Sequence, residues 1–83
     1  MTKPILLKAN VNKEQALETI DFLYGEYIDF VSETPDNKIL WISNGATVAK
    51  WTDEYKNIMI SEDFVNMVSE DREYFINKYW HYI

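Results

Sequence analysis

Few side chains in this 83-residue sequence could carry out covalent or acid–base chemistry. The chain has no cysteine, two glycines and a single histidine, His81. It therefore offers no thiolate nucleophile and no glycine-rich loop of the kind that cradles phosphates. His81 stands near the C-terminus without a neighbouring group that would orient it as a general base. We expect that the protein is not an enzyme and has no catalytic residues.

Acidic residues could in principle bind a metal, and they stand next to each other in three places: Asp53-Glu54, Glu62-Asp63 and Glu70-Asp71. Adjacent residues on a helix point in different directions, so these pairs lack the spacing of metal ligands. The sequence also contains no EF-hand pattern of alternating acids before a glycine. We expect neither a metal nor any other cofactor.

The net charge limits the classes of partner that the protein is expected to bind. Fourteen acids and eight bases give a net charge of −6, and Arg72 is the one arginine. Contacts to phosphates rely on lysine and arginine, so we expect no direct binding to nucleic acid or to an anionic membrane. The apolar run Ile5–Leu7 is too short for a signal peptide or a membrane span. Together with the lack of cysteine, this predicts a cytoplasmic protein.

Half of the acids lie in one segment. Seven of the fourteen fall between residues 14 and 36, where no lysine, arginine or histidine occurs. On a helical wheel of about 100° per residue, Phe22 lies opposite the apolar stripe, on the same face as Glu18 and Asp29, which Glu14 and Glu26 flank. An aromatic side chain surrounded by carboxylates predicts a partner-binding face. Its residues are Glu14, Glu18, Asp21, Phe22, Glu26, Asp29 and Glu33. The alternative is a solvated face on which Phe22 is tolerated or covered by the C-terminal segment.

The C-terminal segment is rich in aromatic rings: Tyr74, Phe75, Tyr79, Trp80, His81 and Tyr82. At helical spacing, Phe75, Tyr79 and Tyr82 share a face with Val68, which predicts that they belong to the core. A domain this small is only marginally stable alone. We therefore consider a self-association surface in a homodimer, formed by Tyr74, Trp80 and Tyr82. An aromatic cap over the sheet is the alternative.

The first half of the chain must position the acidic segment. A period of two predicts a strand over residues 4–11, with Pro4 at its start: Ile5, Leu7, Ala9 and Val11 alternate with Leu6, Lys8 and Asn10. Asn12 and Gln15 have the spacing of a capping box at the start of a helix. Apolar residues then recur every three or four positions, and this spacing predicts a helix over residues 13–32. The apolar run 38–43 predicts a central strand.

The second half begins with a hairpin signal. Asn44-Gly45 favours a tight type I′ turn, followed by a return strand over residues 46–52. The spacing of Val48, Trp51, Tyr55 and Ile58 permits a helix there instead. A short strand is expected at 57–61, followed by a helix over 62–81, either continuous or bent near Ser69. Asp71 and Arg72 favour the bend, because they would lie on the apolar face of a continuous helix.

These elements predict one domain, residues 1–83, of the α+β class. Its order is β-α-β-β-β-α, a small antiparallel sheet with helices packed on one face. The sequence thus favours a small acidic protein-binding module that inhibits a basic, nucleic-acid-handling protein, such as a nuclease or a DNA-binding effector. The acidic helix would act as a DNA mimic in a groove meant for a phosphate backbone.

Small acidic inhibitors of this type occur among phage anti-defence and immunity proteins, an analogy of class alone. A composition rich in asparagine, lysine, isoleucine and tyrosine fits a phage or a mobile element. Two other functions are open: a ferredoxin-like regulatory module that binds a ligand, and a small homo-oligomeric assembly protein.

Overall fold

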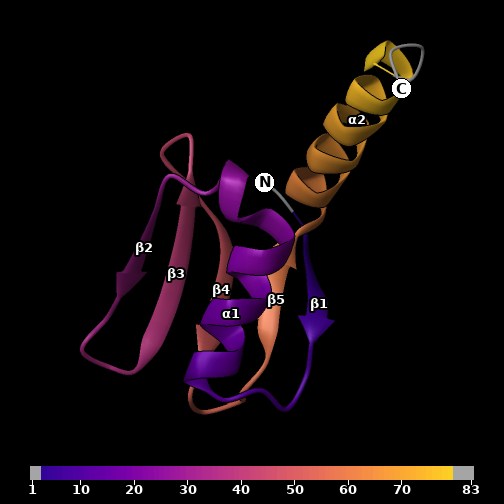
Figure 1. The fold of residues 1–83 in the computed structure, drawn as a ribbon. Coiled ribbons are helices and arrows are strands. Elements are labelled where there is room, and N and C mark those ends of the chain that lie inside the picture. The colour runs from indigo at the N-terminus through magenta and orange to yellow at the C-terminus, as the bar shows by residue number, and fades with distance from the viewer. Residues whose placement is uncertain (1–2, 80–83) are drawn as a thin grey trace.

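Five segments form strands and two form helices in the computed structural model, which describes residues 3–79 (Figure 1). The strands are β1 (Pro4–Lys8), β2 (Phe30–Glu33), β3 (Lys38–Ser43), β4 (Ala46–Thr52) and β5 (Ile58–Ser61). The helices are α1 (Lys13–Tyr24), which continues into a 3-10 turn (Gly25–Tyr27), and α2 (Glu62–Tyr79).

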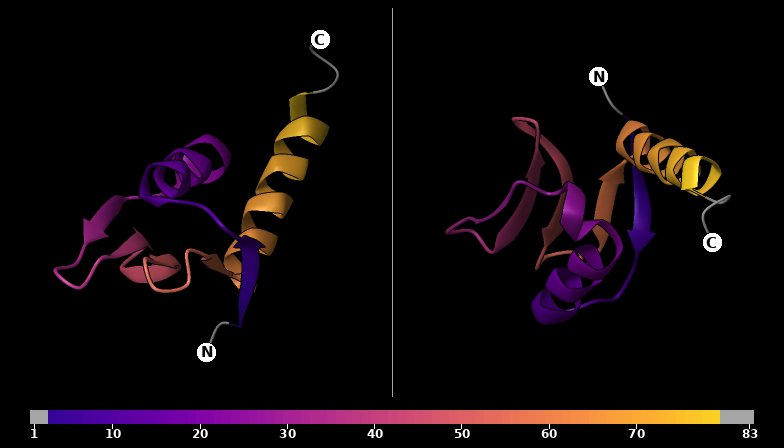
Figure 2. Two further views of the ribbon diagram at one scale, coloured as in Figure 1. Left: turned by 90° about the horizontal axis from the view of Figure 1, so that it is seen from below. Right: turned by 45° about the horizontal axis from the view of Figure 1, so that its top comes forward.

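The strands form an antiparallel sheet in the order β1-β5-β4-β3-β2. Strands β2 to β5 follow one another as a meander, while β1 pairs with β5 at the opposite edge. The chain passes from one edge to the other through α1, which lies across one face of the sheet (Figure 2). Helix α2 rises steeply on that same side. The predicted α+β class with helices on one face of an antiparallel sheet is confirmed.

Helix α1 begins as predicted and ends early. The Asn12 side chain accepts a hydrogen bond from the Gln15 N–H at 2.8 Å, and the Gln15 side chain accepts one from the Asn12 N–H at 2.9 Å. The predicted helix over 13–32 is wrong beyond Tyr24, because β2 occupies its last residues. Phe30 pairs with Ile42 in β3. The pairing of β2 with β3 stabilises the strand conformation there more than the helical spacing of the apolar residues stabilises a helix. The sheet consequently has one strand more than predicted.

The hairpin between β3 and β4 follows from its turn residues. Asn44 has a φ of 51° and Gly45 a φ of 74°, the two positive values that a type I′ turn needs. Strand β4 follows directly, so the helical alternative for this segment is wrong.

The core lies between the sheet and the two helices. Its sheet residues include Trp41 and Trp51, and the indole N–H of Trp51 donates a hydrogen bond of 2.9 Å to the Val11 carbonyl. The helices contribute Ala16, Ile20, Tyr24, Phe64 and Val68.

Helix α2 is continuous, so the predicted bend near Ser69 is wrong. Its first turns pack on the core through Phe64 and Val68, and the Ser61 hydroxyl caps it by accepting the Phe64 N–H at 3.3 Å. Beyond Val68 the helix projects past the sheet (Figure 1), and Phe75 is exposed. The predicted core role of Phe75 is therefore wrong. Asp71 and Arg72 do not enter the core, because they lie beyond Val68, the last buried residue of the described part of α2.

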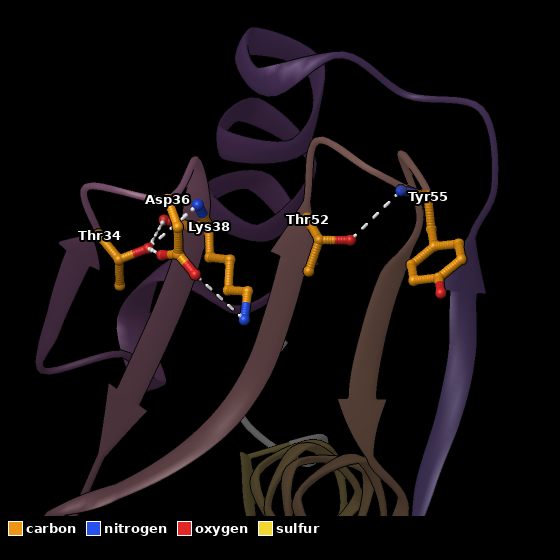
Figure 3. Close-up of polar contacts among 5 residues, drawn as sticks. All are labelled: Thr34, Asp36, Lys38, Thr52 and Tyr55. Atoms are coloured by element: carbon orange, nitrogen blue, oxygen red, sulfur yellow. Dashed lines mark hydrogen bonds and ion pairs between the residues drawn. The ribbon is translucent and has the colours of Figure 1, made fainter.

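Two turns close one end of the sheet (Figure 3). Between β2 and β3, the Thr34 hydroxyl donates to the Asp36 carboxylate, and the Lys38 ammonium lies 3.3 Å from the same carboxylate. The Thr34 hydroxyl, and then Lys38, lower the pKa of Asp36 below its usual value. Between β4 and β5, the Tyr55 N–H donates to the Thr52 hydroxyl at 3.4 Å.

Candidate functional site

The outer surface of α1 carries a ridge formed by Glu14, Glu18, Asp21 and Phe22, all exposed; Glu14 and Glu18 are four residues apart, and Asp21 and Phe22 follow Glu18 by three and four residues. Phe22 is 87% exposed, so it lies on the solvent side, as the helical wheel predicts, and the described part of the C-terminal segment does not cover it. Within residues 3–79, no ion pair involves the three carboxylates of this ridge. We call these four residues the α1 ridge.

The other three predicted members of the face lie elsewhere, because α1 ends at Tyr24. Glu26 sits in the 3-10 turn, with its carboxylate 3.8 Å from the Arg72 guanidinium. Asp29 precedes β2 and accepts the backbone N–H of Asn44 at 2.7 Å. Glu33 ends β2 and forms an ion pair of 2.5 Å with Lys13. The predicted continuous helical face over residues 14–33 is thus wrong. Within residues 3–79, the acids of this set that have neither an ion pair nor a side-chain hydrogen bond are those of the α1 ridge.

A groove runs between α1 and the edge strand β2, with a volume of about 470 Å³. Its floor is apolar, and its rim carries the carboxylates of Glu18, Asp21 and Asp29; among the described residues, no base lines it. The apolar lining residues are Leu17, Ile20, Ile28, Phe30, Val31 and Trp41. Such a surface suits a ligand with an aliphatic stem and a cationic head.

The two ends of the segment from α1 to β2 are held in different ways. The Lys13–Glu33 ion pair joins the start of α1 to the end of β2. At the other end the chain turns directly from α1 through Gly25 into β2, and an ideal Cβ at Gly25 would lie only 3.0 Å from the Asp21 carboxylate oxygen. The absence of a side chain at Gly25 therefore leaves room for that carboxylate at the rim.

The opposite flank of α1 differs in charge. A shallow hollow between α1 and β1 is lined by Phe22, Thr19, Leu23, Glu18 and Lys8. Lys8 thus lies on the β1 side of Phe22, together with Glu18. The β2 side of the ridge is the more acidic, because Glu18, Asp21 and Asp29 line the groove there, whereas Glu18 and Lys8 line the hollow on the β1 side.

A polar junction between α1 and α2 is not foreseen from the sequence. The Tyr27 hydroxyl donates a hydrogen bond of 2.6 Å to the Asp71 carboxylate, which is the main cause of a raised Tyr27 pKa. The Arg72 guanidinium donates to the Leu23 carbonyl and lies 5.7 Å from the ring centres of Tyr24 and Tyr27. The signal was present in the sequence: an adjacent acid and base on an otherwise apolar helical face.

The predicted self-association surface is described only in part. Tyr74 is exposed on α2, while Trp80 and Tyr82 lie outside the described residues. His81 lies outside them as well. Self-association of the chain through these residues stays a prediction.

Neither metal ligands nor a membrane span is found between residues 3 and 79. That part of the chain brings together no group of three or more acids, histidines or cysteines able to hold a metal ion. Its helices are too short or too polar to cross a bilayer.

The fold and the site define a small α+β protein in which a helix with an acidic ridge crosses a five-stranded antiparallel sheet. No protein-family model, curated protein sequence or solved structure matches the chain.

Proposed function

We propose that this protein is a binding module without catalytic activity, and that it engages a basic protein through the α1 ridge and the adjoining groove. The observation that carries the proposal is the exposure of Phe22 beside Glu18 and Asp21, which form no ion pair within the described chain. Carboxylates that are unpaired in the free protein can accept lysine or arginine without breaking an existing contact. A nearby exposed ring supplies apolar area to the same interface.

The partner class follows from charge. With seven acids and no base between residues 14 and 36, this region attracts a cationic surface and repels nucleic acid. We propose a basic, nucleic-acid-handling partner, such as a nuclease or a DNA-binding effector, which the module inhibits by occupying its phosphate-binding surface. Phage anti-defence and immunity proteins are the functional analogy, and the proposed location is the cytoplasm.

The length of α1 limits how much of a phosphate backbone it could imitate. Helix α1 has 12 residues and is about 18 Å long. Its ridge can therefore replace only a short stretch of phosphate backbone, in contrast to the groove-filling helix that the sequence predicts. A local block of a few basic residues fits this length better than imitation of a full turn of DNA.

The experiment is a pull-down from a host lysate with wild-type protein and with Phe22→Ala, followed by affinity measurements at increasing salt. Phe22→Ala should weaken binding by about 2 kcal/mol or more, with little change in thermal stability. Tyr55→Ala, at an exposed ring on the β4–β5 turn, is the matched control and should leave binding unchanged. Captured proteins that are not enriched in basic chains, or binding that ignores salt, would contradict the proposal.

A second candidate is a homo-oligomeric assembly protein. The observation that favours it is the exposed apolar surface on the projecting half of α2, which includes Tyr74, Phe75 and Ile76. Sedimentation at rising concentration tests it, and a strictly monomeric protein at high micromolar concentration would exclude it. The ferredoxin-like alternative has less structural basis, because four consecutive strands replace the β-α-β-β-α-β order of that fold. A ligand-binding role stays a prediction, which thermal-shift screening would test.

A further inference from the structure

We propose that the basic partner binds as an extended segment that adds a sixth strand at the edge of β2 and places basic side chains in the groove beside α1. This inference rests on the proposed function and specifies how the partner engages the surface.

Strand β2 offers backbone hydrogen-bonding groups to such a segment. It is the last strand of the sheet, and the Thr34 N–H donates to the Lys38 carbonyl at 2.9 Å just beyond its end. Inward and outward groups alternate in an antiparallel pair, so Ser32 faces β3 while Val31 and Glu33 direct their N–H and C=O groups away from the sheet. In the described chain no strand lies on that side. An added strand would pair with these groups.

The groove supplies the complementary side-chain site. Val31 lies opposite Trp41, a core residue, so its side chain points to the α1 side of the sheet. Val31 is nevertheless 44% exposed, because α1 does not extend over this edge. Alternate side chains of an added strand would point to the same side as Val31, toward Glu18 and Asp21. A lysine or arginine there can lay its aliphatic stem on the apolar floor and its charge against the rim.

Charge selects a basic partner over a second copy of this chain. Edge-to-edge pairing of two β2 strands would bring together two grooves that are rimmed by Glu18, Asp21 and Asp29 and that no base within residues 3–79 lines. The net charge of −6 adds to this repulsion. The same negative charges would attract a cationic segment.

The test uses the full-length chain and a synthetic peptide, acetyl-Thr-Lys-Thr-Lys-Thr-Lys-Thr-amide. Amide exchange measured by NMR should slow at Val31 and Glu33 on peptide addition by about tenfold or more. Two control peptides separate charge from backbone pairing. One carries glutamate in place of lysine, and the other carries N-methyl groups on its alternate backbone amides. Neither control should protect the β2 amides.

A variant of the protein tests whether the outward edge of β2 binds the peptide. Val31→Pro removes one outward N–H, and the hydrogen bonds that β2 makes to β3 do not use that group. It should weaken binding of the lysine peptide by about tenfold or more. The N-methylated peptide provides the same test on the unmodified protein if this variant does not fold.

The outcomes distinguish this inference from the proposed function. If Glu18→Gln and Asp21→Asn weaken peptide binding while N-methylation does not, the acidic surface binds without strand addition, and only the inference fails. If neither the two charge substitutions nor N-methylation of the peptide changes peptide binding, both the inference and the proposed function fail. Concentration-dependent protection of Val31 without peptide would show that a second copy occupies the edge, which also overturns the inference.

Discussion

The hydroxyl of Tyr27 donates a hydrogen bond of 2.6 Å to the carboxylate of Asp71, a residue 44 positions further along the chain. This contact joins the 3-10 turn after α1 to the middle of α2. It lies just beyond Val68, the last residue of α2 in the buried core. The projecting half of α2 is thus joined to the turn after α1 by a polar contact at its base, where the buried apolar packing ends.

Tyr27→Phe should loosen the projecting half of α2 and leave the rest of the fold intact. The substitution keeps the ring but removes the donor to Asp71, so the turns after Val68 should open more often. We expect amide exchange in residues 70–79 to accelerate by about three- to tenfold, as measured by mass spectrometry. Tyr55→Phe, at an exposed ring, is the control. Unchanged exchange in Tyr27→Phe would show that the hydrogen bond does not hold the helix.

The same hydrogen bond predicts a pH dependence. The Tyr27 pKa is raised above its ordinary value of 10.0, chiefly because the neutral hydroxyl donates to Asp71. The folded protein therefore holds this proton more tightly than the unfolded chain. The stabilisation is fully present below pH 10.0 and is lost as the pH rises through the folded-state pKa. Urea midpoints measured between pH 8 and 11 should fall more steeply for wild type than for Tyr27→Phe, and equal slopes would contradict the assignment.

Much of the fold can be predicted from local signals. Asn12 with Gln15 starts α1, and Asn44 with Gly45 makes the hairpin, because each pair satisfies backbone requirements within a few residues. The end of α1 cannot be predicted in this way. The segment from Ile28 to Glu33 keeps helical periodicity, and its strand conformation depends on pairing with β3, which no local pattern encodes.

The candidate site, too, can be predicted only in part from local sequence signals. Acidity and the exposure of Phe22 follow from composition and helical spacing, and the structure agrees. Which carboxylates are paired depends on contacts distant in sequence, such as Lys13 with Glu33 and the Asn44 N–H with Asp29. The groove beside β2 exists because the chain leaves the helix at Tyr24, so an expectation of one long helix could not include it.

Asn12→Ala should destabilise the protein by about 1 kcal/mol, because it removes the side-chain acceptor for the Gln15 N–H at the start of α1. Urea unfolding followed by tryptophan fluorescence measures the loss. Asn66→Ala, at an exposed position within α2, is a matched control that should change stability little. An equal effect of the two substitutions would mean that the capping box contributes nothing specific.

Trp51→Phe should destabilise the protein by about 2 kcal/mol or more, because the smaller ring leaves a gap in the core and the Val11 carbonyl loses its indole donor. Trp41→Phe removes a similar ring area from the core and keeps the Val11 hydrogen bond, so it isolates the polar contribution. We expect Trp51→Phe to be the more damaging change in thermal or urea unfolding. Equal losses would assign the whole effect to packing.

Glu18→Lys should stabilise the free protein while weakening its binding. Glu18 lies four residues after Glu14 and three before Asp21, so like charges repel along the ridge. A lysine there reverses both interactions and should add about 0.5 kcal/mol to the free energy of unfolding at low salt. Glu54→Lys, in the exposed β4–β5 turn, changes the net charge equally away from the ridge and is the control.

A gain in stability together with a loss of binding in Glu18→Lys would show what the charge of the α1 ridge does. A surface shaped only for the stability of the monomer would avoid consecutive carboxylates on one helix, since exchanging one for lysine removes repulsion. If Glu18→Lys raises the urea midpoint and abolishes capture of the basic partner, the ridge maintains its charge for binding, at the expense of stability. If Glu18→Lys and Glu54→Lys reduce capture equally, net charge alone governs binding, and the α1 ridge has no particular role.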